Sequence, residues 1–187
     1  MKLIPGRQLR ILDFDIENRP LTYYVPDHPT AEITSIAACP LGKTIPQVWL
    51  LGQHTMKEIL LGFKALYDEA EMVTGHYITR HDLPIINAHL VEEGLEPLAP
   101  KLAQDTKTDL IKWKDIPKTQ EHLAEMLGCP IAKVHMTQAD WREANRLTPA
   151  GLAKTKKRVQ TDVLQHMWIR QALLDRGMLK PPRIWRP

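Results

Sequence analysis

Acidic and apolar residues alternate near the start of the chain, in the segment ILDFDIEN at residues 11–18. Successive side chains of a β-strand point to opposite faces, so Asp13, Asp15 and Glu17 share one face and the apolar residues share the other. Same-face neighbours lie roughly 7 Å apart along a strand, so the three negative charges repel, most strongly away from water. The pattern predicts either a sheet edge with a solvated acidic face or a site where positive charge offsets the carboxylates.

Two more acidic residues occur in apolar surroundings further along the chain. Asp82 lies in VTGHYITRHDLPIIN, just after a short strand pattern that ends in glycine. Asp162 lies in the helical segment KRVQTDVLQHMW, beside an apolar stripe formed by Val159, Val163 and Met167. A carboxylate at the margin of such a stripe is usually solvated, so neither residue identifies a site by itself.

Hydrophobic periodicity predicts one α/β domain. Thr55 and Thr148 suit helix N-caps, Pro149 suits a first helical position, and Gly128 suits a helix end. This order of elements predicts a mixed five-stranded central sheet flanked by helices. We expect strands at 9–17, 32–40, 44–52, 71–77 and within 101–110, and helices at 55–70, 80–94, 119–128 and 148–176.

Composition narrows the class of protein. The chain has 187 residues, 43% of them hydrophobic, with a net charge of +3, which suits a globular domain and is compatible with a polyanionic partner. Its two cysteines, Cys39 and Cys129, form no CxxC pair, which disfavours a disulfide framework or zinc ribbon and suits a reducing cytosol. No leader-like segment and no run of 18 apolar residues occurs, so we expect a cytoplasmic protein with no membrane partner.

Three segments taken together resemble the motifs of the DEDD (DnaQ-like) 3′→5′ exonuclease superfamily, whose members have the ribonuclease H-like fold. Asp15 and Glu17 in FDIEN match the first motif, Asp82 in GHYITRHDLP the second, and Asp162 in RVQTDV the third. The resemblance covers about residues 9–176, and its details are similar to small stand-alone members from bacteriophages and bacteria.

The second motif matches the family only in part. Gly75 and His76 agree with it, whereas Tyr77 stands where the family often has Asn, and His81 where it has Phe.

The resemblance implies that Asp15, Glu17, Asp82 and Asp162 bind two Mg²⁺ or Mn²⁺ ions. Converging carboxylates are unstable as bare anions but are suitable hard oxygen ligands for these ions. Two such ions activate a water and stabilise the leaving 3′ oxygen in phosphodiester hydrolysis. The expected activity is therefore a metal-dependent 3′→5′ exonuclease on single-stranded ends, with DNA favoured. Asp13 lies outside the family's set, and we expect a hydrogen-bonded or sheet-edge carboxylate there.

The third motif departs from the family at the residue that orients or deprotonates the attacking water. The family has a His five residues before the last Asp or a Tyr four before it, and this chain has Lys157 and Arg158 there. On an unbroken helix Arg158 shares a face with Asp162, while Lys157 lies about 140° round the helix axis. Lys157 can reach Asp162 only if the helix breaks or begins near Thr155. We favour Lys157 as the catalytic group. Arg158 is the alternative, and its guanidinium suits bidentate binding of the scissile phosphate. The basic residues within 154–158 are expected either to contact the phosphate backbone of a nucleic acid or to form a solvated helix face.

Other substrate contacts follow from position. We expect Asn18, His76, Tyr77 and Arg158 to contact the 3′-terminal nucleotides, with Tyr77 stacking on a base. Trp113, in the basic segment IKWKDIPK, suits either stacking on bases or packing on the core.

Residues 1–178 are expected to form one exonuclease-like domain, followed by a proline-rich basic tail at 179–187 that is extended or poorly ordered. The chain has no room for a polymerase domain, so a proofreading role requires a replicative polymerase in trans. Three alternatives stay open: a catalytically inactive nucleic-acid-binding or polymerase-associated module, an RNA-trimming exonuclease of the same family, and a structure-selective endonuclease on the same fold.

Overall fold

The computed structural model describes residues 9–20, 31–111, 116 and 118–187, and Trp113 lies outside them. The elements are, in chain order, β1 (Ile11–Pro20), β2 (Ala31–Pro40), β3 (Gln47–Leu50), α1 (Met56–Glu69), β4 (Met72–Gly75), α2 (Asp82–Glu92), β5 (Lys101–Asp105), α3 (Gln120–Leu127), α4 (Gln138–Asn145), α5 (Pro149–Asp175) and β6 (Arg183–Trp185).

The strands form one mixed sheet in the order β3-β2-β1-β4-β5-β6. β1 is antiparallel to β2 along most of its length and parallel to β4 over residues 11–13 only. Within the described residues the sheet has six strands, so the expected number of five was wrong. The extra strand, β6, comes from the proline-rich tail. Arg183–Trp185 contains no proline, so its backbone pairs with the edge of β5.

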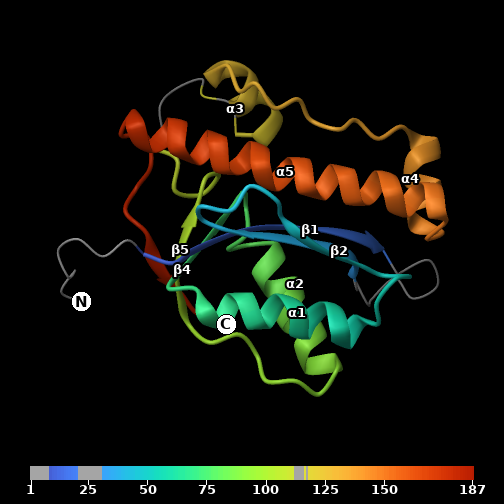
Figure 1. Ribbon diagram of the computed structural model, residues 1–187. Coiled ribbons are helices and arrows are strands. Elements are labelled where there is room, and N and C mark those ends of the chain that lie inside the picture. The colour runs from blue at the N-terminus through green and yellow to red at the C-terminus, as the bar shows by residue number, and fades with distance from the viewer. Residues whose placement is uncertain (1–8, 21–30, 112–115, 117) are drawn as a thin grey trace.

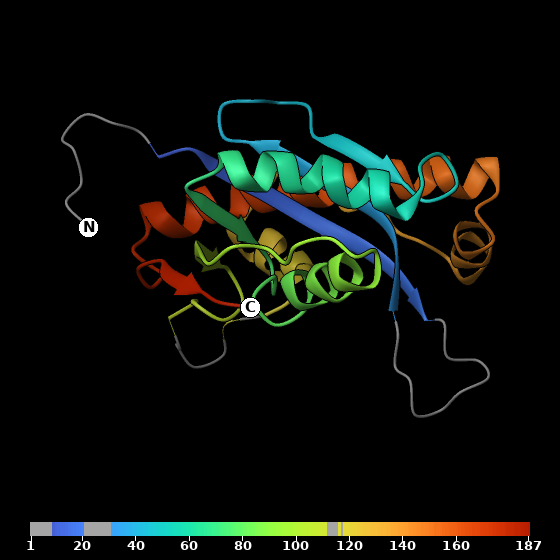
Figure 2. The same ribbon diagram turned by 90° about the horizontal axis from the view of Figure 1, so that it is seen from below.

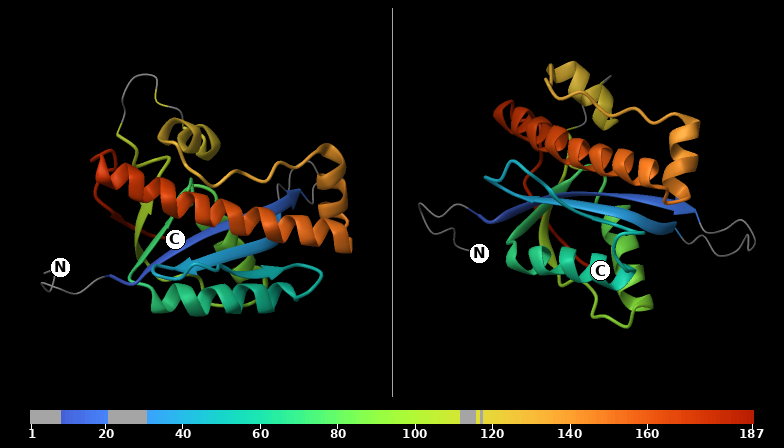
Figure 3. Two further views of the ribbon diagram at one scale, coloured as in Figure 1. Left: turned by 45° about the horizontal axis from the view of Figure 1, so that its top comes forward. Right: turned by 45° about the vertical axis from the view of Figure 1, so that its right-hand side comes forward.

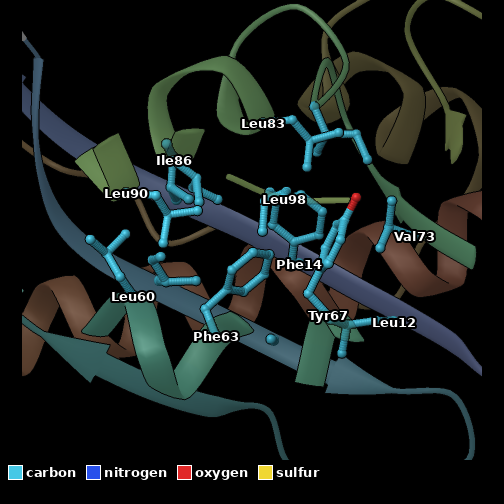
Figure 4. Close-up of a cluster of buried hydrophobic side chains, with 14 of the residues drawn as sticks. Leu12, Phe14, Leu60, Phe63, Tyr67, Val73, Leu83, Ile86, Leu90 and Leu98 are labelled. Carbon is cyan, nitrogen blue, oxygen red and sulfur yellow. The ribbon is translucent and has the colours of Figure 1, made fainter. Parts of the chain in front are cut away.

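Helices cover both faces of this sheet, with α1 and α2 on one side and α5 on the other (Figures 1 and 2). The apolar residues of β1 point toward α1 and α2, where Leu12, Phe14 and Ile16 join the main buried cluster (Figure 4). Phe14 packs on Phe63 of α1, with ring centroids 4.9 Å apart. The alternating pattern of β1 therefore predicted its two faces correctly, and the acidic residues face α5.

The long helix α5 is positioned by its apolar stripe and by its N-cap. Val159 and Val163 pack on Ala37 and Cys39 of β2. The Thr148 hydroxyl accepts a hydrogen bond from the Gly151 N–H, with Pro149 in the first turn, as the sequence predicted. The helix continues without a break to Asp175.

Two shorter helices flank α5: α3 lies on its outer side, and α4 lies across its N-terminal end (Figures 1 and 3). α3 packs on the second half of α5 through Leu123, and Gly128 ends it in a left-handed conformation, as expected. α4 was not predicted, because only Ala144 of its residues is buried and no apolar stripe marks it. The sequence signal that it does carry is a capping box between Thr137 and Asp140.

Among the helices of the described residues, none is both long enough and apolar enough to cross a membrane.

Candidate active site

Three of the four motif carboxylates converge between β1 and α5. Asp15 and Glu17 lie on β1, and Asp162 lies on the facing side of α5. One oxygen of each carboxylate lies within 4.8 Å of the others. The convergence follows from the sheet, because the acidic face of β1 is the face that α5 crosses. We call Asp15, Glu17 and Asp162 the carboxylate cluster.

Asp82 approaches the carboxylate cluster from the edge of β1. It is the first residue of α2, is 2% exposed, and accepts a hydrogen bond of 3.2 Å from the Ile16 N–H. β4 pairs with β1 only as far as Asp13, which leaves this N–H available to Asp82. The contact brings the start of α2 beside the residues of the first motif.

The cluster carries strong electrostatic strain. Burial raises the pKa of Asp15 well above its ordinary value, and the charges of Asp82, Glu17 and Asp162 raise it further. Burial also raises the pKa of Asp82 to about 8, although its backbone hydrogen bonds act in the opposite direction. The pKa values of Glu17 and Asp162 are raised for the same first reason. Such a site favours protons or cations over bare carboxylates.

One cation within the cluster comes from the chain itself. The Arg158 guanidinium pairs with Glu17, and its Nη2 lies 3.7 Å from Asp162 Oδ2. Its Nη1 donates to the Val134 carbonyl at 2.9 Å, and its central carbon lies 5.1 Å from the centre of the Trp141 ring. Arg158 therefore pairs with two of the candidate metal ligands and is itself held by the Val134 carbonyl.

Lys157 does not reach the cluster. It is exposed on α5, and its carbonyl accepts a hydrogen bond from the Thr161 hydroxyl in the regular helix. Because α5 does not break near Thr155, Lys157 stays on the other side of the helix from Asp162. The residue of this pair that the structure brings to the carboxylates is Arg158.

The cluster also retains capacity for a metal ion. Its donors are all carboxylate oxygens, the set that Mg²⁺ and Mn²⁺ prefer. Oδ1 of Asp162 is buried and has no hydrogen-bond partner among the described residues. A buried oxygen without a partner is costly, and a cation would satisfy it. The residues present therefore fit the divalent metal that the family resemblance implies.

A buried residue that the sequence did not single out, Asp105, organises the loop between β4 and α2. Its carboxylate accepts hydrogen bonds from the N–H groups of Tyr77, Thr79, Lys107 and Thr108, and from the Thr79 hydroxyl. Burial acts to raise the pKa of Asp105, but these hydrogen bonds outweigh it and hold the pKa below its ordinary value. The fully ionised carboxylate thus fixes the backbone just before Asp82.

Within this loop Tyr77 adopts a φ of 72°, which is unusual for a residue with a side chain. Its ring is partly exposed, and the Lys107 ammonium lies 3.9 Å from the ring centre. Gly75 is required where the loop leaves β4, because a Cβ there would lie 2.7 Å from the Phe14 carbonyl oxygen and 2.3 Å from Ile78. Tyr77, a residue of the second motif, is therefore held at the surface.

His76 and Asp13 belong to one buried hydrogen-bonded chain. Asp13 Oδ1 lies 2.6 Å from His166 Nδ1, and His166 Nε2 lies 3.0 Å from the Thr106 hydroxyl. That hydroxyl lies 2.9 Å from His76 Nδ1. Burial lowers the pKa of His76 to about 4, with His166 contributing in the same direction. Asp13 is the hydrogen-bonded carboxylate that the sequence predicted, and its partner is His166.

Asn18 lies just beyond an irregularity in the pairing of β1 with β2, between Glu17 and Asn18 itself. It is partly buried and pairs with Ile33 of β2. The neighbouring Arg19 donates to Glu32 at 2.5 Å and also bonds to the Asn145 carbonyl at the end of α4. Asn18 thus follows the cluster directly along β1.

No protein-family model matches this chain, and no curated protein matches it in sequence. Solved structures match it in fold. A family B DNA polymerase from the hyperthermophilic archaeon Pyrobaculum calidifontis superposes with a TM-score of 0.67 at 19% identity, covering 90% of this chain and 25% of the polymerase chain. RNase D from Trypanosoma brucei superposes with a TM-score of 0.62 at 13% identity, covering 89% of this chain and 58% of RNase D.

The chain thus spans less than two thirds of the length of either neighbour. At these identities the likeness establishes the fold. The chain has the ribonuclease H-like α/β fold that the sequence predicted, with a mixed sheet between α5 on one face and α1 and α2 on the other.

Proposed function

We propose that this protein is a divalent-metal-dependent 3′→5′ exonuclease that hydrolyses phosphodiester bonds at the 3′ end of single-stranded nucleic acid, with DNA favoured. The observation that carries the proposal is the carboxylate cluster. Its three residues come from two elements far apart in the sequence, lie within 4.8 Å of one another, and leave a buried Asp162 oxygen without a partner. Asp82 lies beside them, hydrogen-bonded to the backbone N–H of Ile16 between Asp15 and Glu17.

In the proposed mechanism, two Mg²⁺ or Mn²⁺ ions bound by these carboxylates supply Lewis acidity toward the attacking water and the leaving 3′ oxygen. The protein holds the ligands in place before substrate arrives. Asp82 fixes the edge of β1 through the Ile16 N–H, and Arg158 orients Glu17 and Asp162. Tyr77 offers a partly exposed ring on which a terminal base can stack.

The fold neighbours are compatible with either nucleic acid, since one is a DNA polymerase and the other is named RNase D. We favour DNA on the resemblance to small stand-alone bacteriophage and bacterial members. In that setting the protein would remove 3′-terminal nucleotides in trans for a replicative polymerase. RNA trimming is the alternative within the same chemistry, and the 2′-hydroxyl would distinguish the two substrates.

A second function, a catalytically inactive nucleic-acid-binding module, is favoured by one observation. Arg158 stands where the family places its Tyr, and it pairs with two of the candidate metal ligands. A guanidinium there supplies positive charge without a metal, but its pKa is too high for it to act as a general base.

A cleavage assay with 5′-labelled single-stranded DNA and a matched RNA, in Mn²⁺, Mg²⁺ or EDTA, separates these functions. We expect a ladder that shortens from the 3′ end only when metal is present, and more rapidly on DNA. Rapid shortening of RNA alone would indicate the trimming enzyme. Binding of either strand without cleavage in any metal would contradict the exonuclease and support the binding module.

A further inference from the structure

The segment between α3 and α4, residues 128–137, runs along α5 on its outer side (Figures 1 and 3). Two side chains of α5 fasten it. Arg158 Nη1 donates to the Val134 carbonyl at 2.9 Å, and Gln165 Nε2 donates to the Ile131 carbonyl at 2.8 Å. Positions 158, 162 and 165 share one face of a helix, because they are spaced by four and three residues. The segment is thus held on both sides of Asp162.

Lys133 lies between these two attachment points. Its side chain is partly buried, and its positive charge acts to lower the pKa values of Asp15, Glu17 and Asp162. No hydrogen bond or ion pair joins its ammonium to another residue in the part of the chain that the structure describes. The hydrogen bonds to the Ile131 and Val134 carbonyls therefore hold the backbone around Lys133 against the part of α5 that carries Asp162, while its ammonium is bonded to none of the cluster carboxylates.

Arg158 and Lys133 are the two positively charged side chains at the site, and they differ in their hydrogen bonding. Arg158 donates to Glu17 through Nε and to the Val134 carbonyl through Nη1, so this side chain orients a ligand and fastens the segment. The ammonium of Lys133 keeps all three of its donors available. A cation beside the ligands with free donors is placed to bind an anion that enters the site, and the anion of a nucleic-acid strand is its phosphate.

We propose that Lys133 is a catalytic residue whose ammonium binds a non-bridging oxygen of the scissile phosphate. This proposal rests on the exonuclease function proposed above. In the reaction the water oxygen bonds to phosphorus while the bond from phosphorus to the 3′ oxygen breaks. The products are a 5′-monophosphate and a strand with a new 3′-hydroxyl, which receives a proton from solvent as the water loses one. Lys133 offsets the charge that develops on the non-bridging oxygens.

The test compares wild-type protein with Lys133→Gln, Lys133→Arg and a matched control, Lys57→Gln. Lys57 is exposed on α1, on the opposite face of the sheet, so its substitution makes the same charge change away from the site. Single-turnover cleavage of 5′-labelled single-stranded DNA in Mn²⁺ gives the rate, and the Mn²⁺-induced rise in melting temperature reports metal binding. Binding of the same DNA in Ca²⁺ over a salt series is measured independently of cleavage.

For Lys133→Gln we expect a rate about 100-fold below wild type, from the loss of one preorganised electrostatic contact. Lys133→Arg should recover most of that loss, and Lys57→Gln should match wild type. The Mn²⁺-induced rise in melting temperature should be unchanged, because Lys133 is not a ligand. The slope of log affinity against log salt should decrease by about 0.7, the value for one phosphate contact on a single strand.

Cleavage by Lys133→Gln at a rate within threefold of wild type would overturn the proposal while leaving the exonuclease function intact. A lost Mn²⁺ response would also overturn it, because Lys133 would then be supporting the ligands. If wild-type protein cleaves neither DNA nor RNA, the proposed function fails by itself. The Ca²⁺ binding series then decides on the phosphate contact: a reduced salt slope supports it, and an unchanged slope overturns it.

Discussion

The Arg158 guanidinium on α5 donates a hydrogen bond to the Glu17 carboxylate on β1, although the two residues are 141 positions apart in the sequence. Both side chains are largely buried, with 15% and 14% of their surface exposed. This contact joins the first and third motifs directly. It also means that the protein carries part of the positive charge that its acidic cluster requires.

Replacing Arg158 should therefore lower the free energy of unfolding of the metal-free protein. For Arg158→Gln we expect a loss of about 2 kcal/mol, or about 4–8 °C in melting temperature, because Glu17 and Asp162 lose a buried partner. Thermal unfolding in EDTA measures the loss, and Mn²⁺ should recover part of it by supplying charge to the same carboxylates. The exposed Arg142 on α4 provides the control, Arg142→Gln, which should unfold like wild type. Equal melting temperatures for Arg158→Gln and wild type in EDTA would contradict the structural role.

The substitution Asp15→Asn should separate catalysis from folding. It removes a central candidate ligand, so we expect activity to decrease by at least about 100-fold and the Mn²⁺-induced rise in melting temperature to be lost. In EDTA the variant should be at least as stable as wild type, because a neutral amide relieves repulsion with Asp82, Glu17 and Asp162. Cleavage assays and melting curves in parallel test this, and wild-type activity in Asp15→Asn would refute the site.

The stability of the metal-free protein should depend on pH in a defined direction. Burial raises the folded-state pKa of Asp82 from the ordinary 3.8 to about 8, so the folded protein binds more protons than the unfolded chain between these values. The contribution of Asp82 to the free energy of unfolding is therefore complete below about pH 4, and it is lost as the pH increases toward 8. Asp15, Glu17 and Asp162 shift in the same direction.

Melting temperatures in EDTA should therefore decrease between about pH 5 and about pH 8.5, and Asp82→Asn should flatten this decrease. Saturating Mn²⁺ should oppose the decrease, because metal binds the ionised carboxylates. A melting temperature in EDTA that increases over this range would show that the cluster does not retain protons in the folded state.

The pair of Asp13 and His166 should contribute to stability as a unit. The two side chains are buried, with Oδ1 and Nδ1 2.6 Å apart. A double-mutant cycle with Asp13→Asn and His166→Gln, measured by urea unfolding, should give a coupling energy of at least about 1 kcal/mol. The partly exposed pair of Lys64 and Asp68 on α1 is the control, with an expected coupling below about 0.5 kcal/mol. Additive losses for Asp13 and His166 would contradict the buried contact.

Local sequence patterns were sufficient to predict several features of this structure. The alternation of β1 separated its acidic residues from Leu12, Phe14 and Ile16, because the side-chain period of a strand is two. The caps at Thr55 and Thr148 depend on residues within one helical turn, so they too could be predicted from the sequence. The ribonuclease H-like fold was recognisable from the motifs and the order of elements, and the structural comparisons confirm it.

Tertiary structure decided the contacts around these residues. The continuity of α5 selected Arg158 over Lys157, and the short pairing of β4 with β1 left the Ile16 N–H to Asp82. Asp105 lies in no motif, because two of its hydrogen-bond partners, Tyr77 and Thr79, are distant from it in the sequence.

The sixth strand of the sheet, β6, was likewise decided by tertiary structure. The pairing of β6 with β5 depends on an open edge that no local pattern describes. Hydrophobic periodicity and helix capping depend on residues close together in the chain, so they can be predicted from the sequence. The partners of a buried charge or a free strand edge are set by packing across the whole domain.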